Sequence, residues 1–233
     1  MRNCPTKSDF RRWWARVAAL LRPESASALP PRPVFVVVEG PRDIEFLRRI
    51  SAILHRCDPT IPDLVSLEAS GRVVFVPFGG DVRPWAFRLA GTGASELHIY
   101  DRETSPETEV RQQVARIVNL RPLCRAFVMR RHSLENYLDA DAVFEACGVR
   151  ITFADQDDVS KTLAQAMYTE RHGDGSWDKL PARSRKRHRD KIKRMLNNAA
   201  VQRMTPQRLA TSDPDHEIRR WLEAIGQLVD GSS

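Results

Sequence analysis

The sequence predicts an α/β fold: a largely parallel sheet of about four strands, flanked by helices and followed by a helical extension. Two observations lead to this prediction. Short apolar runs alternate with longer stretches that have the period of an amphipathic helix, at lengths that fit right-handed crossovers between parallel strands. From about residue 155 onward, only helical periodicity remains.

The first predicted strand covers residues 34–38, VFVVV, an unbroken apolar run typical of a strand buried on both faces. It continues directly into Glu39 and Gly40, and Gly40 is expected to let the chain turn away from the sheet. Pro41 suits the start of a helix, and residues 42–56 have the helical apolar period.

Gly79 and Gly80 predict a tight turn directly after the second strand. Later, Ser105 is expected to cap a helix that begins at Pro106 and extends to about Leu120. The remaining strands are predicted at residues 73–78, 96–100 and 125–129, and the remaining helices at 82–89, 157–169, 185–201 and 215–229.

Composition places the chain among globular proteins, because 42% of its 233 residues are hydrophobic and 29% are charged. We expect an N-terminal helix and Pro/Ser-rich linker over residues 1–33, an α/β domain over 34–150, and a helical extension over 151–233 that packs on the functional face. Trp13 and Trp14, in the predicted first helix over residues 9–21, are candidates for docking a partner.

A membrane or secreted location is not expected. The apolar run nearest the N-terminus, residues 17–21, is far shorter than the roughly 20 residues of a membrane span, and no signal-peptide cleavage site follows it. The four cysteines are scattered and form no C-x-x-C pair, which argues against a zinc site or a disulfide framework. The sequence therefore predicts a cytoplasmic protein without membrane contact.

The charge points to a polyanionic partner, since the net charge is +7. The basic residues concentrate in residues 183–194, RSRKRHRDKIKR. This segment is either a solvated helix face or a surface that contacts phosphates. The candidate nucleic-acid contacts are Arg183, Arg185, Lys186, Arg187, Arg189, Lys191 and Arg194.

Spaced acidic pairs follow two of the predicted strands. Glu39 and Asp43 lie about one helical turn apart after the first strand, and Asp101 and Glu103 follow the third. In an extended segment, Asp101 and Glu103 point to the same side. Since ligands bind at the carboxyl ends of parallel strands, these acids are expected to converge. Crowded carboxylates need a cation, and Mg²⁺ with its oxygen ligands and open water positions suits phosphoester chemistry.

The residues that carry these features resemble the TOPRIM domain of topoisomerases, bacterial primases, ribosomal-RNA maturases and the overcoming-lysogenization-defect (OLD) nucleases. The shared pattern is E-G-x-x-D after the first strand, Gly-Gly after the second, and D-x-D after the third, where Glu103 replaces the second aspartate. The resemblance covers about residues 34–225. It implies a TOPRIM-like sheet and a metal-dependent phosphoester site.

The stretch RRHSLENYL, residues 130–138, resembles an acidic motif of the OLD branch, which implies that Glu135 serves the metal site. The helical tail is similar to the segment in which that branch carries a lysine that assists cleavage. Lys193 is the best match and Lys191 the alternative. The implied catalytic residues are Glu39, Asp101 and Lys193; the implied metal ligands are Glu39, Asp43, Asp101, Glu103 and Glu135.

The resemblance implies an endonuclease that uses one or two Mg²⁺ or Mn²⁺ ions to hydrolyse nucleic acid, with DNA expected before RNA. OLD proteins carry an ATPase domain, whereas this chain has no G-x-x-x-x-G-K-[ST] motif. We therefore expect a separately encoded ATPase as partner, in a role such as defence against phages or plasmids.

Three alternative functions compete with this one. A dinucleotide-binding domain would need G-x-G-x-x-G, which is missing. A phosphatase with Asp101 as its nucleophile would leave Glu39 unexplained. The strongest alternative is a non-catalytic module that keeps the TOPRIM shape and binds nucleic acid or a protein partner.

Overall fold

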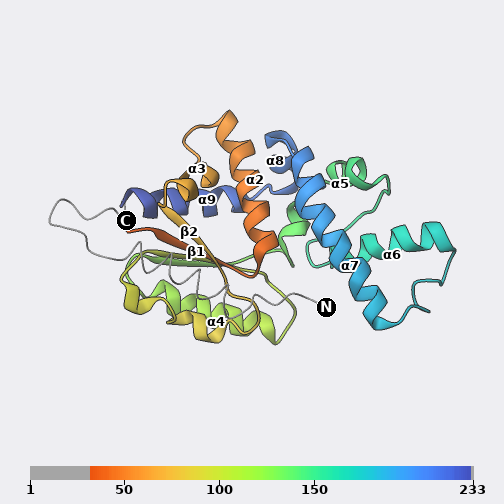
Figure 1. Ribbon diagram of the computed structural model, residues 1–233, viewed down its shortest axis with the longest axis horizontal. Coiled ribbons are helices and arrows are strands. Elements are labelled where there is room, and N and C mark those ends of the chain that lie inside the picture. The colour runs from red at the N-terminus through yellow and green to blue at the C-terminus, as the bar shows by residue number, and fades with distance from the viewer. Residues whose placement is uncertain (1–31, 232–233) are drawn as a thin grey trace. The chain divides into compact units, whose positions relative to one another are not determined.

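The computed structural model describes residues 32–231, and its centre is a four-stranded, all-parallel sheet. The strand order is β2-β1-β3-β4, and helices cover both faces of the sheet (Figure 1). The predicted α/β class and parallel sheet are therefore confirmed. The strands are β1 (Val34–Val38), β2 (Val73–Pro77), β3 (Glu96–Tyr100) and β4 (Cys124–Val128).

Strand β1 is completely buried because both of its faces are covered. Helices α2 (Pro41–Cys57), α3 (Leu64–Ala69) and α9 (Glu217–Asp230) lie on one side, whereas α4 (Glu107–Asn119) lies on the other (Figure 1). This two-sided cover explains why the strand is apolar without alternation.

The helical part after β4 packs against the same core rather than forming a second one. It comprises the short turn Leu134–Tyr137, α5 (Ala140–Cys147), α6 (Val159–His172), α7 (Ala182–Met195) and α8 (Pro206–Ser212). Apolar side chains from α6, α7 and α9 join those of β1 and α2 in one continuous cluster. The described chain from Pro33 onward belongs to one compact unit.

Helix α7 does not end cleanly. It continues into a π-helical turn, Leu196–Ala200, and then into a 3₁₀ turn, Val201–Arg203. The π-helical turn packs against α2 and α5, so it anchors the end of the basic helix to the core. Within residues 32–231, no helix is both long and apolar enough to cross a membrane.

Several local expectations need correction. Residues 82–89 form only the 3₁₀ turn Arg83–Ala86, and the N-cap of α4 is Pro106 rather than Ser105. Gly40 is not required for a turn, because its φ of −157° is an extended conformation that any residue adopts. By contrast, Gly79 and Gly80 have φ values of 46° and 86°, as the predicted tight turn requires.

The predicted first helix over residues 9–21 and the docking role of Trp13 and Trp14 lie outside the described residues.

Candidate functional site

Three carboxylates meet at the carboxyl edge of the sheet. Glu39 follows β1, and Asp101 and Glu103 follow β3, which pairs with β1. One oxygen from each side chain lies within 4.8 Å of the others. Two oxygens on opposite sides of a Mg²⁺ ion are separated by about 4.2 Å, because each lies about 2.1 Å from the ion. Small side-chain adjustments would therefore let all three bind one divalent ion.

Glu103 reaches this cluster through an unusual backbone conformation. Its φ of 57° lies in the left-handed region, which residues other than glycine seldom adopt. The Thr108 hydroxyl supports the turn by donating to the Glu103 carbonyl (3.0 Å). Asp101 and Glu103 thus meet through a left-handed turn and not, as expected, through an extended segment. Backbone strain of this kind is concentrated at functional sites.

Asp43 is fixed by the first turn of α2. The Gly40 N–H donates to Asp43 Oδ2 (2.7 Å), which leaves the other carboxylate oxygen available. Burial raises the pKa of Asp43 to about 7, and repulsion from Glu135 and Glu39 adds to the effect. The Gly40 hydrogen bond and the charge of Lys193 oppose this rise.

Asp101 is the most buried acid of the three-carboxylate cluster, with 8% of its surface exposed. Burial raises its pKa well above the usual range, and the charges of Asp43, Glu39 and Glu135 raise it further. No side chain or backbone group in the described part of the chain donates a hydrogen bond to this carboxylate. Its charge therefore depends on a cation for stabilisation.

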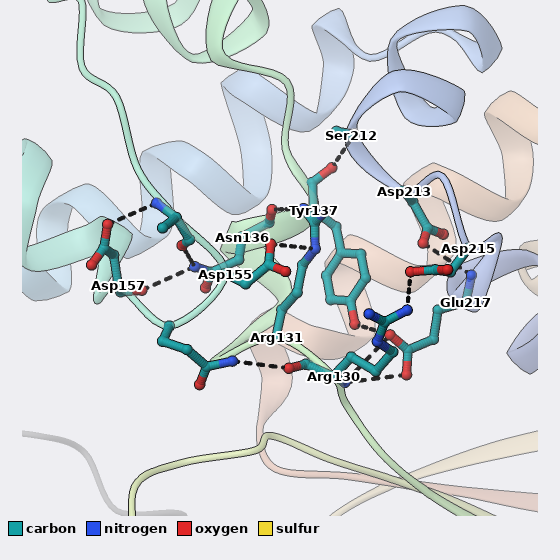
Figure 2. Close-up of polar contacts among 12 residues, drawn as sticks. Arg130, Arg131, Asn136, Tyr137, Asp155, Asp157, Ser212, Asp213, Asp215 and Glu217 are labelled. Carbon is teal, nitrogen blue, oxygen red and sulfur yellow. Dashed lines mark hydrogen bonds and ion pairs between the residues drawn. The ribbon is translucent and has the colours of Figure 1, made fainter.

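Glu135 lies in the turn Leu134–Tyr137, and the two residues that follow it, Asn136 and Tyr137, are anchored by hydrogen bonds (Figure 2). The Asn136 side chain donates to two carbonyls of the loop before α6, at 2.9 and 3.0 Å. The Tyr137 hydroxyl donates to the carboxylate of Glu217 at the start of α9. These hydrogen bonds fix the turn that carries Glu135, whose side chain is only 4% exposed and whose charge acts on Asp43 and Asp101.

Lys193 on α7 completes the group of predicted residues. Its Nζ lies 4.0 Å from Glu135 Oε1. The charge of Glu135 raises the pKa of Lys193, burial opposes this, and Asp101 adds to the rise. The side chain therefore remains a cation at neutral pH. Lys191, the alternative lysine, is exposed on the same helix.

Asn197 belongs to the site although the sequence did not identify it. It lies in the π-helical turn, and its Nδ2 donates to Glu135 Oε1 (2.8 Å) and to the Lys193 carbonyl (2.9 Å). Its Oδ1 is buried and has no hydrogen-bond partner within the described residues. A π-helical turn often marks a functional site. Asn197 lies four residues after Lys193 and therefore on the same helix face, and this spacing is the sequence signal that could have revealed it.

Arg111 is the second residue that the sequence did not identify. It extends from α4, on the opposite side of the sheet from α2, and its Nη2 lies 3.4 Å from both Glu39 and Glu103. Arg111 lies on the same face of α4 as the buried Val114 and Val118. An arginine on the apolar face of a helix is the sequence signal that could have revealed it.

The seven candidate nucleic-acid contacts on α7 divide into two groups. Arg189 pairs with Asp158 and Arg185 is half-buried, so these two are less accessible to a ligand. The others are exposed, and none of them forms an ion pair within residues 32–231: Arg183, Lys186, Arg187, Lys191 and Arg194. We call these five residues the basic face of α7.

The donor set fits a hard divalent ion. All candidate ligands are carboxylate oxygens, which Mg²⁺ and Mn²⁺ prefer. Asn197, whose Nδ2 donates to Glu135, adds a buried amide oxygen without a partner within the described residues. A Cβ atom at Gly40 would meet nothing within 4 Å, so there is open space next to Glu39. Of the five predicted metal ligands, Glu39, Asp101 and Glu103 lie within 4.8 Å of one another. Asp43 and Glu135 lie outside this three-carboxylate cluster, and their charges, like that of Lys193, affect the pKa of Asp101.

Compared with protein-family models, with curated proteins and with solved structures, the chain gives no significant match.

Proposed function

We propose that the protein is a metal-dependent endonuclease that hydrolyses phosphodiester bonds of nucleic acid, with DNA as the expected substrate and Mg²⁺ or Mn²⁺ as the cofactor. One observation carries this proposal. Three carboxylates from the ends of β1 and β3 lie within 4.8 Å of one another, and acids from α2 and from the turn after β4, together with a lysine from α7, lie close enough to affect the pKa of Asp101. Structural ion pairs do not require so many like charges in one buried place.

One or two bound divalent ions would lower the pKa of a water molecule and polarise the phosphate. The residues that would hold the ions are Glu39, Asp43, Asp101 and Glu103, as the TOPRIM resemblance implies, and Glu135, as the OLD resemblance implies. Lys193 remains protonated beside Glu135, so it acts as a fixed positive charge that stabilises the negative charge developing on the phosphate. Its raised pKa makes it unsuitable as a general base.

The basic face of α7 leads toward this site. The helix has 14 residues, so it extends for about 21 Å from Ala182 to the turn that holds Asn197. A phosphate backbone lying along the exposed side chains would arrive at the helix end that carries Lys193. This arrangement supports nucleic acid as the substrate.

The proposal predicts cleavage that depends on a divalent ion. Purified protein incubated with plasmid, linear and single-stranded DNA and with RNA should cut at least one of the DNA substrates when Mg²⁺ or Mn²⁺ is present. Chelation by EDTA should abolish the activity. Binding to these substrates without any cleavage, with either ion, would instead support a non-catalytic module.

A second prediction concerns the basic face. Changing three of its residues to glutamine should weaken DNA binding and reduce the slope of log K against log salt by about 2 to 3, because each lost phosphate contact contributes about 0.9. The variant carries Arg183→Gln, Lys186→Gln and Arg187→Gln. The matched control replaces three exposed arginines on other helices: Arg56, Arg116 and Arg220. Equal slopes for the variant and the wild type would show that the basic face is only solvated.

The OLD resemblance also supports a separately encoded ATPase partner. Co-purification of the full chain with such a protein would test this part of the proposal.

A further inference from the structure

Arg111 is buried deeply but is poorly satisfied. Only 8% of its surface is exposed, yet its Nη1 has no hydrogen-bond partner within the described residues. Its Nη2 contacts Glu39 and Glu103 at 3.4 Å, well beyond the 2.7–2.9 Å typical of charge-assisted hydrogen bonds. A buried guanidinium usually binds its acidic partners much more closely, since burial of a charge is costly.

Another arginine of the same chain forms a full pair of hydrogen bonds with a carboxylate and serves as a comparison. Arg48 binds Glu68 through two nitrogens, at 2.8 and 2.6 Å, in the paired geometry that suits a carboxylate. Arg111 makes no such pair, although two carboxylates are adjacent to it. Its position between Glu39 and Glu103 therefore leaves hydrogen-bonding capacity for another anion.

We propose that Arg111 binds the phosphate group on which the site acts, through Nη1, the guanidinium nitrogen that has no partner within the described residues. This inference rests on the proposed phosphoester function and adds a substrate-binding residue to it. Arginine suits the role because its planar fork presents several N–H donors to phosphate oxygens. Glu39 and Glu103, which contact Arg111, are also candidate metal ligands, so an anion bound to the ion would lie beside the guanidinium.

Arg111 and Lys193 would then contact the phosphate from opposite sides of the sheet edge. Arg111 extends from α4, whereas Lys193 comes from α7 in the helical part. Because Lys193 lies next to Glu135 and Arg111 lies next to Glu39 and Glu103, neither can replace the other. The two cations are expected to contribute separately.

The test uses adenosine monophosphate as a soluble phosphate probe and adenosine as its phosphate-free control. Calorimetry with Mg²⁺ present should show that Arg111→Met binds adenosine monophosphate about tenfold to a hundredfold more weakly than the wild type, the usual effect of losing a charge-assisted hydrogen bond. Mg²⁺ affinity should stay equal or increase, since a competing cation is removed. Adenosine should bind no more weakly to the variant than to the wild type.

Two further variants separate this role from a structural one. Arg116→Met removes an exposed arginine from the same helix and should leave the affinity unchanged. Arg111→Lys keeps the charge, so it should preserve the melting temperature, but its single ammonium group should still weaken binding severalfold. This variant decides the question if Arg111→Met does not fold.

Wild-type affinity for adenosine monophosphate in a folded Arg111 variant would overturn the inference. So would an equal loss in Arg116→Met, because the effect would then come from overall charge. This inference and the nuclease proposal can fail independently of each other. If Arg111 binds the probe but no nucleic acid is cut, only the nuclease proposal fails; if cleavage occurs and Arg111→Met binds the probe normally, only this inference fails.

Discussion

Replacing Asp101 by asparagine is expected to abolish cleavage and also to make the metal-free protein more stable at neutral pH. The loss of activity follows because an asparagine amide cannot supply the negative charge that a divalent ion requires. We expect a fall in rate of at least about a thousandfold, toward the level without metal. The gain in stability follows because the substitution removes a buried charge from a group of like charges.

The pH dependence should reveal the same effect. The folded-state pKa values of Asp43, about 7, and Asp101 are both raised above those of the unfolded chain. The folded state therefore binds protons at these two carboxyl groups more tightly than the unfolded chain does, and this proton binding stabilises the fold. The stabilisation is complete below about pH 4 and is lost as the pH rises through the folded-state pKa values. For Asp43, the loss extends from about pH 4 to about pH 7.

Thermal unfolding in EDTA, measured from pH 4 to pH 8, checks this expectation. The melting temperature of Asp101→Asn should exceed that of the wild type by about 3 °C or more at pH 8, and the difference should vanish toward pH 4. Asp178→Asn, at an exposed site, should behave like the wild type. If Asp101→Asn were less stable at pH 8 or retained full activity, Asp101 would be a structural residue.

The second large effect is expected for Lys193→Ala, which should slow cleavage by about a hundredfold to a thousandfold. The ammonium group lies 4.0 Å from Glu135 and is held in place by α7, so it is preorganised to stabilise charge on the phosphate. Divalent-ion affinity should not decrease, because a cation is no metal ligand. It should increase slightly, since a positive charge next to the acids is removed.

Lys191→Ala is the matched control, because Lys191 is an exposed lysine on the same helix. It should cut at nearly the wild-type rate, with a small effect on DNA binding only. Steady-state kinetics with saturating Mg²⁺ would separate turnover from binding. Normal turnover in Lys193→Ala would remove this residue from the mechanism, and a loss in Lys191→Ala instead would show that the assignment of the two lysines is reversed.

Much of the fold could be predicted because the strands carry a strong local signal. The run VFVVV can be stable only where both of its faces are covered, and this requirement leads directly to a parallel sheet with helices on both sides. Glu39 and Asp101 could be placed together for a related reason, since the carboxyl ends of neighbouring parallel strands lie at one edge.

The contacts that complete the site could not be predicted in this way. Arg111 and Asn197 reach the acids only through tertiary packing, and their spacing from Val114 and from Lys193 places them on a helix face without indicating what they contact. The left-handed conformation of Glu103 is likewise set by its surroundings, because glutamate has no preference for it. The short helices α5 and α8, of 8 and 7 residues, are too brief to show a clear apolar period.

The central claim is that the acids at the carboxyl edge of the sheet bind a divalent ion. The most direct measurement is a Mn²⁺ titration of the wild type and Asp101→Asn at neutral pH, with free Mn²⁺ followed by electron paramagnetic resonance. The wild type should bind one or two ions that Mg²⁺ displaces, and Asp101→Asn should lose this binding. Absence of Mn²⁺ binding by the wild type, or equal binding by both proteins, would contradict the claim.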